Sequence, residues 1–127
     1  FDNISFDKSA EIYNQLILKK LPKKEGVPQF DLILLGMGCD GHTASLFPNT
    51  KAISEAKKYV VLNKINKKNT HRITFTFPLL LNSKEILVIC VGDEKNKIIN
   101  SLYSDKPPEL PILKIVQECN KLTWLTS

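Results

Sequence analysis

Residues 30–48 read FDLILLGMGCDGHTASLFP, and this stretch decides how the rest of the chain is interpreted. It begins as an apolar run, Phe30–Leu35, of the kind found in buried strands, and then places glycines at positions 36, 38 and 41. Because glycine has no Cβ, backbone N–H groups in such a loop can approach an anion. At the rim of the loop, Asp40 could orient His42, and His42 could act as a general base. The competing interpretation is an ordinary strand-to-loop turn with a capping Asp and a solvated His.

The composition narrows the class of protein. The chain has 127 residues, is 43% hydrophobic and 24% charged, and has a formal net charge of +5. These values are typical of a globular domain, and no apolar run approaches the roughly 20 residues that a membrane span needs. A basic balance favours anionic partners, either nucleic acid or small phosphorylated metabolites. Because aromatic residues are not interleaved with the lysines, we expect solvated surface lysines, no nucleic acid and no membrane partner.

The cysteines and histidines indicate neither a disulfide framework nor a metal centre. Cys39, Cys90 and Cys119 are odd in number and widely spaced, and His42 and His71 do not complete a ligand set. We expect no metal and no cofactor. Cys90 lies in an apolar run and is interpreted as a core residue. Three reduced thiols and the absence of a visible secretory signal predict a cytoplasmic protein.

Apolar runs between polar segments predict several short strands. We expect them at Phe30–Leu35, Tyr59–Leu62, Ile73–Phe77, Ile86–Val91, Ile112–Val116 and Leu122–Leu125. The Lys/Asn-rich segment Asn63–Asn69 is predicted to be a loop, Thr43–Leu46 a short helix or turn, and Leu79–Leu81 an apolar turn or short helix.

Two longer helices are expected. The first runs from Lys8 to about Leu21, with Asp7 as N-cap and a stop at Pro22, and its apolar face would hold Ile12, Tyr13, Leu16 and Ile17. The second follows Gly92. Strands that alternate with helices predict an α/β fold with a mainly parallel sheet and flanking helices, Rossmann-like in class.

Four blocks along the chain resemble the 6-phosphogluconolactonase family. Leu34–Pro48 fills every fixed position of the family pattern L-L-G-x-G-x-D-G-H-x-A-S-L-F-P. His71–Pro78 is similar to its R-[IV]-T-x-T block, Val91–Lys95 to its second glycine turn, and Leu122–Leu125 to its terminal strand. The blocks occur in the family's order over most of residues 10–125. The resemblance implies a fold of the sugar-phosphate isomerase type.

The resemblance implies hydrolysis of 6-phospho-D-glucono-1,5-lactone in the pentose phosphate pathway. His42 would activate a water for attack on the lactone carbonyl, because an imidazole with an ordinary pKa of about 6.5 is mostly neutral at cytosolic pH. Asp40 would hold the imidazole tautomer or stabilise the imidazolium. Capping the turn is an equally good role for Asp40.

The resemblance also implies residues that meet the substrate. Backbone N–H groups around Gly36, Gly38 and Gly41 are candidates for stabilising the oxyanion, although these glycines could serve only to permit positive φ. Arg72 and Lys95 would bind the phosphate. Alternatively, Arg72 is a surface charge on a strand and Lys95 an ordinary lysine in a first helical turn.

Phe47 separates two related activities. Glucosamine-6-phosphate deaminases share the glycine loop but carry an acidic residue just before the proline, where this chain has Phe47. A Phe cannot transfer a proton, which favours the lactonase. A deaminase-like isomerase and a non-catalytic sugar-phosphate-binding module remain as alternatives.

Residues 1–127 are expected to form only part of the family domain. Family members have a further N-terminal portion of similar size with a glycine-rich phosphate-binding turn, and residues 1–29 contain no such turn. Half a sheet would leave a strand edge and an apolar face uncovered. Because some lineages fuse this domain to glucose-6-phosphate dehydrogenase, fusion to or association with that enzyme is left open.

Overall fold

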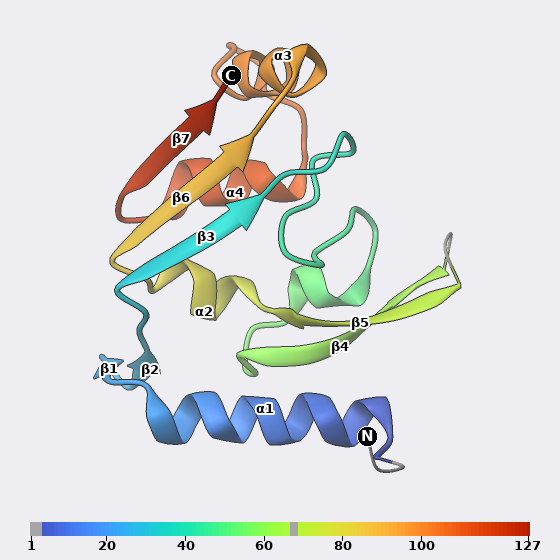
Figure 1. The fold of residues 1–127 in the computed structure, drawn as a ribbon, viewed down its shortest axis with the longest axis vertical. Coiled ribbons are helices and arrows are strands. Elements are labelled where there is room, and N and C mark those ends of the chain that lie inside the picture. Colours follow the sequence, from blue (N-terminus) through green and yellow to red (C-terminus); the bar gives the residue numbers. More distant parts are fainter. Residues whose placement is uncertain (1–3, 67–68) are drawn as a thin grey trace.

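The computed structural model describes residues 4–66 and 69–127 as a mixed α/β fold (Figure 1). Within those residues no helix is both long and apolar enough to cross a lipid bilayer. The elements in chain order are α1 (Phe6–Lys20), β1 (Lys23–Lys24), β2 (Val27–Pro28), β3 (Leu32–Gly36), the 3-10 helix η1 (Lys51–Ser54), β4 (Val60–Ile65), β5 (Thr70–Phe75), α2 (Phe77–Leu81), β6 (Glu85–Cys90), α3 (Asp93–Leu102), α4 (Pro111–Glu118) and β7 (Leu122–Thr126).

The central sheet is parallel, as the sequence predicts. Its strand order is β3-β6-β7, and both pairings are parallel, with Leu35 opposite Val88 and Val88 opposite Trp124. Because all three strands run in the same direction, their carboxyl ends meet at one edge (Figure 1). The two glycine turns of the sequence, after β3 and after β6, therefore lie side by side at that edge.

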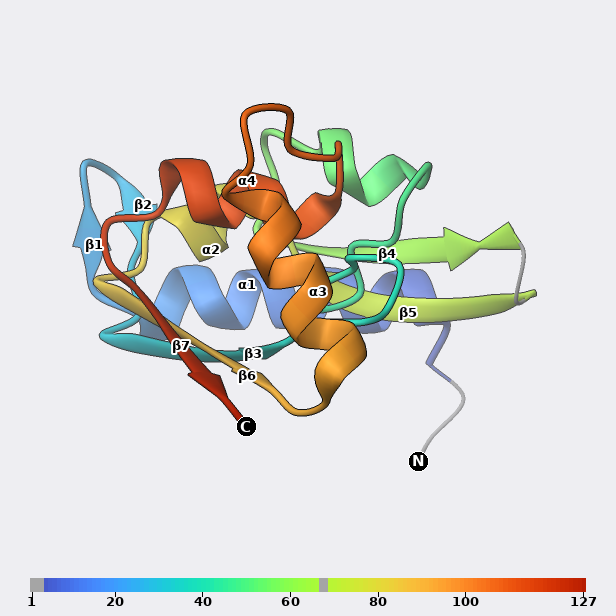
Figure 2. The same cartoon turned by 90° about the horizontal axis from the view of Figure 1, so that it is seen from above.

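One face of this sheet carries the main hydrophobic core. Its inward side chains pack against α2, α3 and α4, which lie on the same side of the sheet (Figure 2). Cys90 is part of this core, as expected, and burial raises the pKa of its thiol. The fully buried members of the core are Leu46, Phe77, Leu80, Ile86, Val88, Ile112 and Ile115.

The opposite face of the sheet is uncovered in the part of the chain that the structure describes. Alternation along β3 buries Ile33 and Leu35 but leaves Leu32 and Leu34 exposed. Ile89 and Leu125 continue this exposed apolar face across the sheet. The apolar run Phe30–Leu35, of the kind found in buried strands, is thus buried on one face only, and the expected uncovered face and open β3 edge are present among the described residues.

A separate antiparallel hairpin, β4–β5, packs on α1. Asn14 of α1 accepts hydrogen bonds from the backbone N–H groups of Tyr59 and Val60, at 2.9 and 3.1 Å. These bonds turn the Ala10–Asn14–Ile17 face of α1 inward. The expected apolar face is therefore wrong except for Ile17, since Ile12, Tyr13 and Leu16 are exposed.

Several predicted boundaries need correction. Ser5, not Asp7, caps α1, because its hydroxyl accepts a hydrogen bond from the Lys8 N–H. Ile112–Val116 forms part of α4 rather than a strand. The first three residues of the predicted loop Asn63–Asn69 belong to β4, and residues 67 and 68 of that loop lie outside the described residues. The strand predicted at Ile73–Phe77 is β5, which begins and ends earlier, at Thr70–Phe75.

Two neighbouring leucines of β3 test which face is covered. Leu35 is 8% exposed and Leu34 is 60% exposed. We expect Leu35→Ala to lower the free energy of unfolding of this chain by about 2–5 kcal/mol, through lost burial and a new cavity. Leu34→Ala should cost less than about 1 kcal/mol, as is usual at an exposed position. Urea unfolding monitored by circular dichroism measures both values, and equal losses would contradict the assignment of Leu34 to an open face.

Candidate functional site

The loop that follows β3 is closed by its own hydrogen bonds. Gly38 N–H donates to the His42 carbonyl at 2.9 Å, and Gly41 N–H donates to the Gly38 carbonyl at 3.0 Å. The Thr43 hydroxyl donates back to the carbonyl of Gly36, at 2.9 Å. From the other side, the Ile112 N–H at the start of α4 donates to the Gly41 carbonyl at 3.0 Å. The loop is thus fixed to both the strand and a helix.

The three glycines of the loop serve different purposes. A Cβ at Gly38 would lie 2.1 Å from the His42 ring, so only glycine leaves room for the imidazole. Gly41 has φ +74°, and a Cβ there would lie 2.6 Å from the Leu110 side chain. Gly36 has neither a positive φ nor a close neighbour on its open side. The positive-φ interpretation therefore holds for Gly41 alone.

The N–H groups of Gly38 and Gly41 are both engaged within the loop. In this arrangement neither is directed at a ligand, so their main contribution is to the shape of the loop. Substrate binding by Gly36, Gly38 and Gly41 stays a prediction.

The His42 imidazole is held by two side chains of the same loop. Its Nδ1 lies 2.5 Å from Oδ1 of Asp40, and its backbone N–H donates to that oxygen at 3.1 Å. The Phe47 ring stacks on the imidazole with centroids 4.1 Å apart and an interplanar angle of 22°. The His42 side chain remains 27% exposed, so it lies at the lip of the sheet and not in the interior. A bond at Nδ1 leaves Nε2 as the second ring nitrogen available to a ligand.

Asp40 is the titratable group that this geometry changes most clearly. Partial burial disfavours its charged form, but the hydrogen bonds from the His42 ring and backbone outweigh burial and hold the pKa of Asp40 below its ordinary value. The carboxylate is therefore ionised at neutral pH. An ionised Asp40 favours a proton on Nδ1 of His42, because it can only accept hydrogen bonds.

Lys95 reaches the same loop from the neighbouring glycine turn. It lies in the first turn of α3, which Gly92 precedes, and its Nζ donates to the Met37 carbonyl at 2.5 Å. This contact follows from the parallel pairing of β3 and β6, since it joins the two turns at the carboxyl edge of the sheet. Lys95 of α3 thus contacts the loop that carries Asp40 and His42, and a shared functional site of the three stays a prediction.

Arg72 approaches from the hairpin. It lies opposite Asn63 in the β4–β5 register, on the same strand face as Thr74. That face contacts the loop: Thr74 Oγ1 accepts from the Ser45 N–H at 3.0 Å, and Asn63 Nδ2 donates to the Ser45 carbonyl at 2.8 Å. Arg72 itself is exposed, and its guanidinium donates to the His71 carbonyl at 3.4 Å. The hairpin therefore aims Arg72 at the loop side, although no direct contact with His42 or Lys95 is recorded among the described residues.

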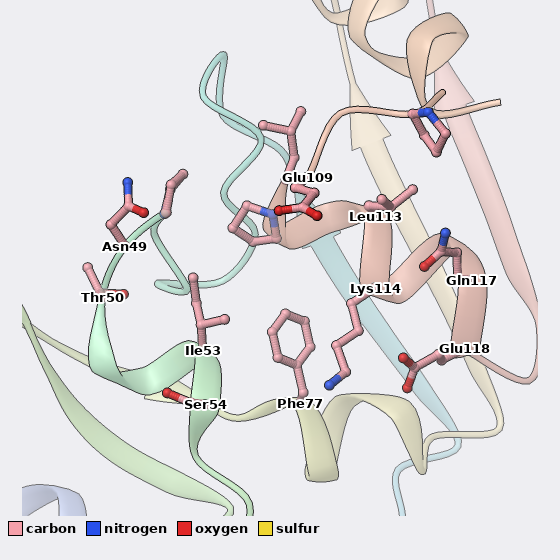
Figure 3. Close-up of a pocket in the computed structure, with 14 residues that line it drawn as sticks. Asn49, Thr50, Ile53, Ser54, Phe77, Glu109, Leu113, Lys114, Gln117 and Glu118 are labelled. Carbon is pink, nitrogen blue, oxygen red and sulfur yellow. The ribbon is translucent and has the colours of Figure 1, made fainter. Parts of the chain in front are cut away.

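Two hollows flank the segment from Phe47 to Thr50. One, of about 400 Å³, is lined by Asp40, Phe47, Ile65 and Asn66 together with the segment itself, and the His42 ring is not part of its lining. The other, of about 700 Å³, lies between η1, α2 and α4 (Figure 3). Its walls include Phe77 and Lys114, whose Nζ lies 5.2 Å from the Phe77 ring centroid (Figure 3). The larger hollow contains none of the predicted site residues, whereas the smaller one contains Asp40 but not His42, Arg72 or Lys95.

Sequence reasoning missed the residues that support the site from a distance. The sequence predicts a loop at Asn63, yet this residue is buried on β4, and its side chain donates to the Ser45 carbonyl of the segment after β3. Thr43 and Thr74, which anchor the loop to β3 and β5, carry no signal that separates them from other threonines. Among the described residues, no three His, Cys, Asp or Glu side chains are grouped closely enough to hold a metal ion.

A parallel sheet with a glycine loop and an Asp–His pair at its carboxyl edge defines a class of α/β proteins that bind small ligands there. Residues 2–124 match the family model described as glucosamine-6-phosphate isomerases/6-phosphogluconolactonase. The chain therefore belongs to the glucosamine-6-phosphate isomerase/6-phosphogluconolactonase family.

Curated relatives and solved structures agree with this placement. A 6-phosphogluconolactonase of Chlamydia pneumoniae is 36% identical over 93% of this chain and 45% of its own length. One of Treponema pallidum is 38% identical over 84% of this chain and 44% of its own length. The solved 6-phosphogluconolactonase of Trypanosoma cruzi superposes with a TM-score of 0.78 at 31% identity, over 94% of this chain and 49% of that one. The chain thus spans about half the length of the relatives that it matches.

The lowered pKa of Asp40 predicts a pH effect on stability. A carboxyl group whose pKa is lower in the folded state contributes stability at neutral pH and loses it as pH falls through the folded-state value. Asp40→Asn should therefore be less stable than the wild type at pH 7. The difference should shrink as pH falls below about 4, because the unfolded-state carboxyl becomes protonated first and the folded-state carboxyl only at lower pH.

Thermal unfolding of both proteins between pH 7 and pH 2 measures this difference. Asp31→Asn, which removes an exposed carboxylate paired with Lys84 at 2.6 Å, controls for the loss of one surface charge. A constant gap between wild type and Asp40→Asn over this range would rule out the proposed linkage.

Proposed function

We propose that this chain carries the general base of an enzyme that hydrolyses 6-phospho-D-glucono-1,5-lactone to 6-phospho-D-gluconate in the pentose phosphate pathway. The observation that carries the proposal is the His42 ring, fixed through Nδ1 by an ionised Asp40 at the exposed edge of the sheet. Relatives that bear the name 6-phosphogluconolactonase support the substrate class.

The proposed reaction uses Nε2 of His42, the ring nitrogen that Asp40 does not contact. Nε2 accepts a proton from water as the water oxygen attacks the lactone carbonyl carbon, and the carbonyl becomes an oxyanion. The bond from this carbon to the ring oxygen then breaks, and the imidazolium returns its proton to the departing oxygen. Asp40 stabilises the imidazolium between the two steps, because its carboxylate already accepts the Nδ1–H.

The substrate phosphate needs cations near the same edge. Lys95, fixed at the Met37 carbonyl, and Arg72, on the hairpin face beside the loop, are the residues we assign to it. An Arg fork suits a phosphate bidentately, and Lys adds a point charge. Lys95 would exchange its carbonyl partner for a phosphate oxygen when the substrate binds.

The uncovered apolar face of the sheet supports a domain that is larger than residues 1–127. We assign residues 1–127 to part of a lactonase domain, the rest of which pairs with β3 and covers Leu32, Leu34, Ile89 and Leu125. The relatives support this, since each is about twice as long as the matched region. Catalysis then belongs to the longer polypeptide. Fusion to or association with glucose-6-phosphate dehydrogenase remains an option for that polypeptide, and the unpaired thiols of Cys39, Cys90 and Cys119 suit a reducing compartment such as the cytoplasm.

His42→Ala tests the assignment of the base. In the longer protein, this change should lower kcat for lactone hydrolysis by at least about 100-fold, which is the lower range for losing a general base. His71→Ala is the matched control, because His71 is exposed and stacks on Phe6 away from Asp40. Release of acid from freshly prepared lactone, followed with a pH indicator, measures both variants.

Near-normal turnover by His42→Ala would reject His42 as the base. Activity in the longer protein but not in residues 1–127 would assign the difference to the missing part of the domain. Ammonia release from glucosamine 6-phosphate would favour a deaminase instead, although Phe47 stands where that chemistry needs an acid.

A further inference from the structure

Phe47 is a buried side chain of the candidate site that takes no part in the proton transfers of the proposed lactone chemistry. It is 8% exposed, yet neither of the two hydrophobic clusters among the described residues includes it. Its ring instead lies against the His42 imidazole, at 4.1 Å between centroids and nearly parallel. Stacking on the imidazole is therefore one role of this buried ring.

The backbone around Phe47 is held from the hairpin. The Thr50 hydroxyl donates to the Phe47 carbonyl at 2.7 Å, and Asn63 Nδ2 donates to the Thr50 hydroxyl oxygen at 2.9 Å. Asn63 also binds the carbonyl of Ser45 at 2.8 Å, and it is 1% exposed on β4. Pro48 restricts the backbone of Phe47 to extended conformations. The aromatic ring is thus presented to His42 by a rigid support.

The imidazole would otherwise keep a degree of freedom. Asp40 binds the ring at one atom, Nδ1, and because χ2 of histidine is broad, this single hydrogen bond still allows a range of ring tilts. The Gly38 backbone lies so close to one side of the ring that a Cβ at this position would be only 2.1 Å from it. Phe47 covers a ring face. Together these contacts define the plane of the ring and hence the direction of Nε2.

We propose that Phe47 is a positioning residue that fixes the plane of the His42 imidazole so that Nε2 faces the substrate. The inference rests on the proposed lactone hydrolysis. Phe47 and Asp40 also both line the hollow of about 400 Å³. In this chain the residue before Pro48, Phe47, would thus orient the His42 base by stacking, whereas the acidic residue at this position in the deaminases takes part in proton transfer.

The test compares Phe47→Ala, Phe47→Leu and Phe47→Tyr in the longer protein. Leu keeps most of the apolar volume but removes the flat ring, whereas Tyr keeps the ring. Because a shift of about 1 Å in a catalytic group can cost about 100-fold, we expect the Ala and Leu variants to lose about 10- to 100-fold in kcat. Their KM should stay within about threefold of the wild type, because binding of the phosphate is untouched, and the Tyr variant should keep kcat within about threefold.

Nuclear magnetic resonance supplies a readout that does not depend on activity. A benzene ring stacked on the imidazole shifts the His42 ring-proton resonances upfield, so these resonances should move downfield in Phe47→Ala and Phe47→Leu but not in Phe47→Tyr. Phe30→Leu is the control for loss of an aromatic ring elsewhere, since Phe30 packs against both clusters and Phe75. It should lower stability without moving either readout.

Wild-type kcat in folded Phe47→Leu, unchanged His42 resonances, or failure of Phe47→Tyr to restore kcat would each overturn the inference. If the wild-type longer protein hydrolyses no lactone, the proposed function fails and the ring resonances alone decide whether Phe47 positions His42. The two failures are thus distinguishable.

Discussion

The hydrogen bond between Asp40 and Nδ1 of His42 is the interaction on which the candidate site depends. It exists because the loop folds back on itself through the Gly38–His42 backbone bond, which places the carboxylate and the imidazole on one rim. That closure in turn requires glycine at position 38, where any Cβ would occupy the space of the imidazole. A backbone constraint thus determines the geometry of a proton-transfer pair. The same bonds that shape the loop consume the N–H groups of Gly38 and Gly41, so loop architecture and anion binding compete for the same donors.

The parallel sheet turns this local loop into a site. Because β3 and β6 run in the same direction, their following turns lie together, and Lys95 of the second turn reaches the Met37 carbonyl of the first. The hairpin adds the third component: it binds the loop backbone through Thr74 and Asn63 and carries Arg72 on the same face. Three segments far apart in sequence therefore converge on a single loop. The other face of the sheet, which carries the exposed Leu32 and Leu34, is not covered by any of these segments.

The part of this arrangement that local sequence specifies was predictable, and the part that depends on distant contacts was not. The strand, the glycine loop and the Asp40–His42 pair follow from one continuous stretch. In contrast, Ile112–Val116 is rich in β-branched residues and suggested a strand, but Pro111 at the first helical position and the Ile112 N–H bond to Gly41 favour a helix. The Lys/Asn-rich composition of residues 63–69 predicts a loop at Asn63, whereas the partners that bury Asn63 on β4 are 13 and 18 positions away in sequence. The stacking of Phe47 on His42 likewise depends on how the loop closes, which no periodicity encodes.

The tautomer of His42 in the resting protein tests the central claim most directly. Chemical shifts of the two imidazole nitrogens, measured by nuclear magnetic resonance on 15N-labelled protein at a pH where the ring is neutral, distinguish a protonated Nδ1 from a protonated Nε2. The account predicts that the proton resides on Nδ1, bound to Asp40, with Nε2 free to accept a proton from water. A proton found mainly on Nε2, or shared equally between the two nitrogens, would contradict it.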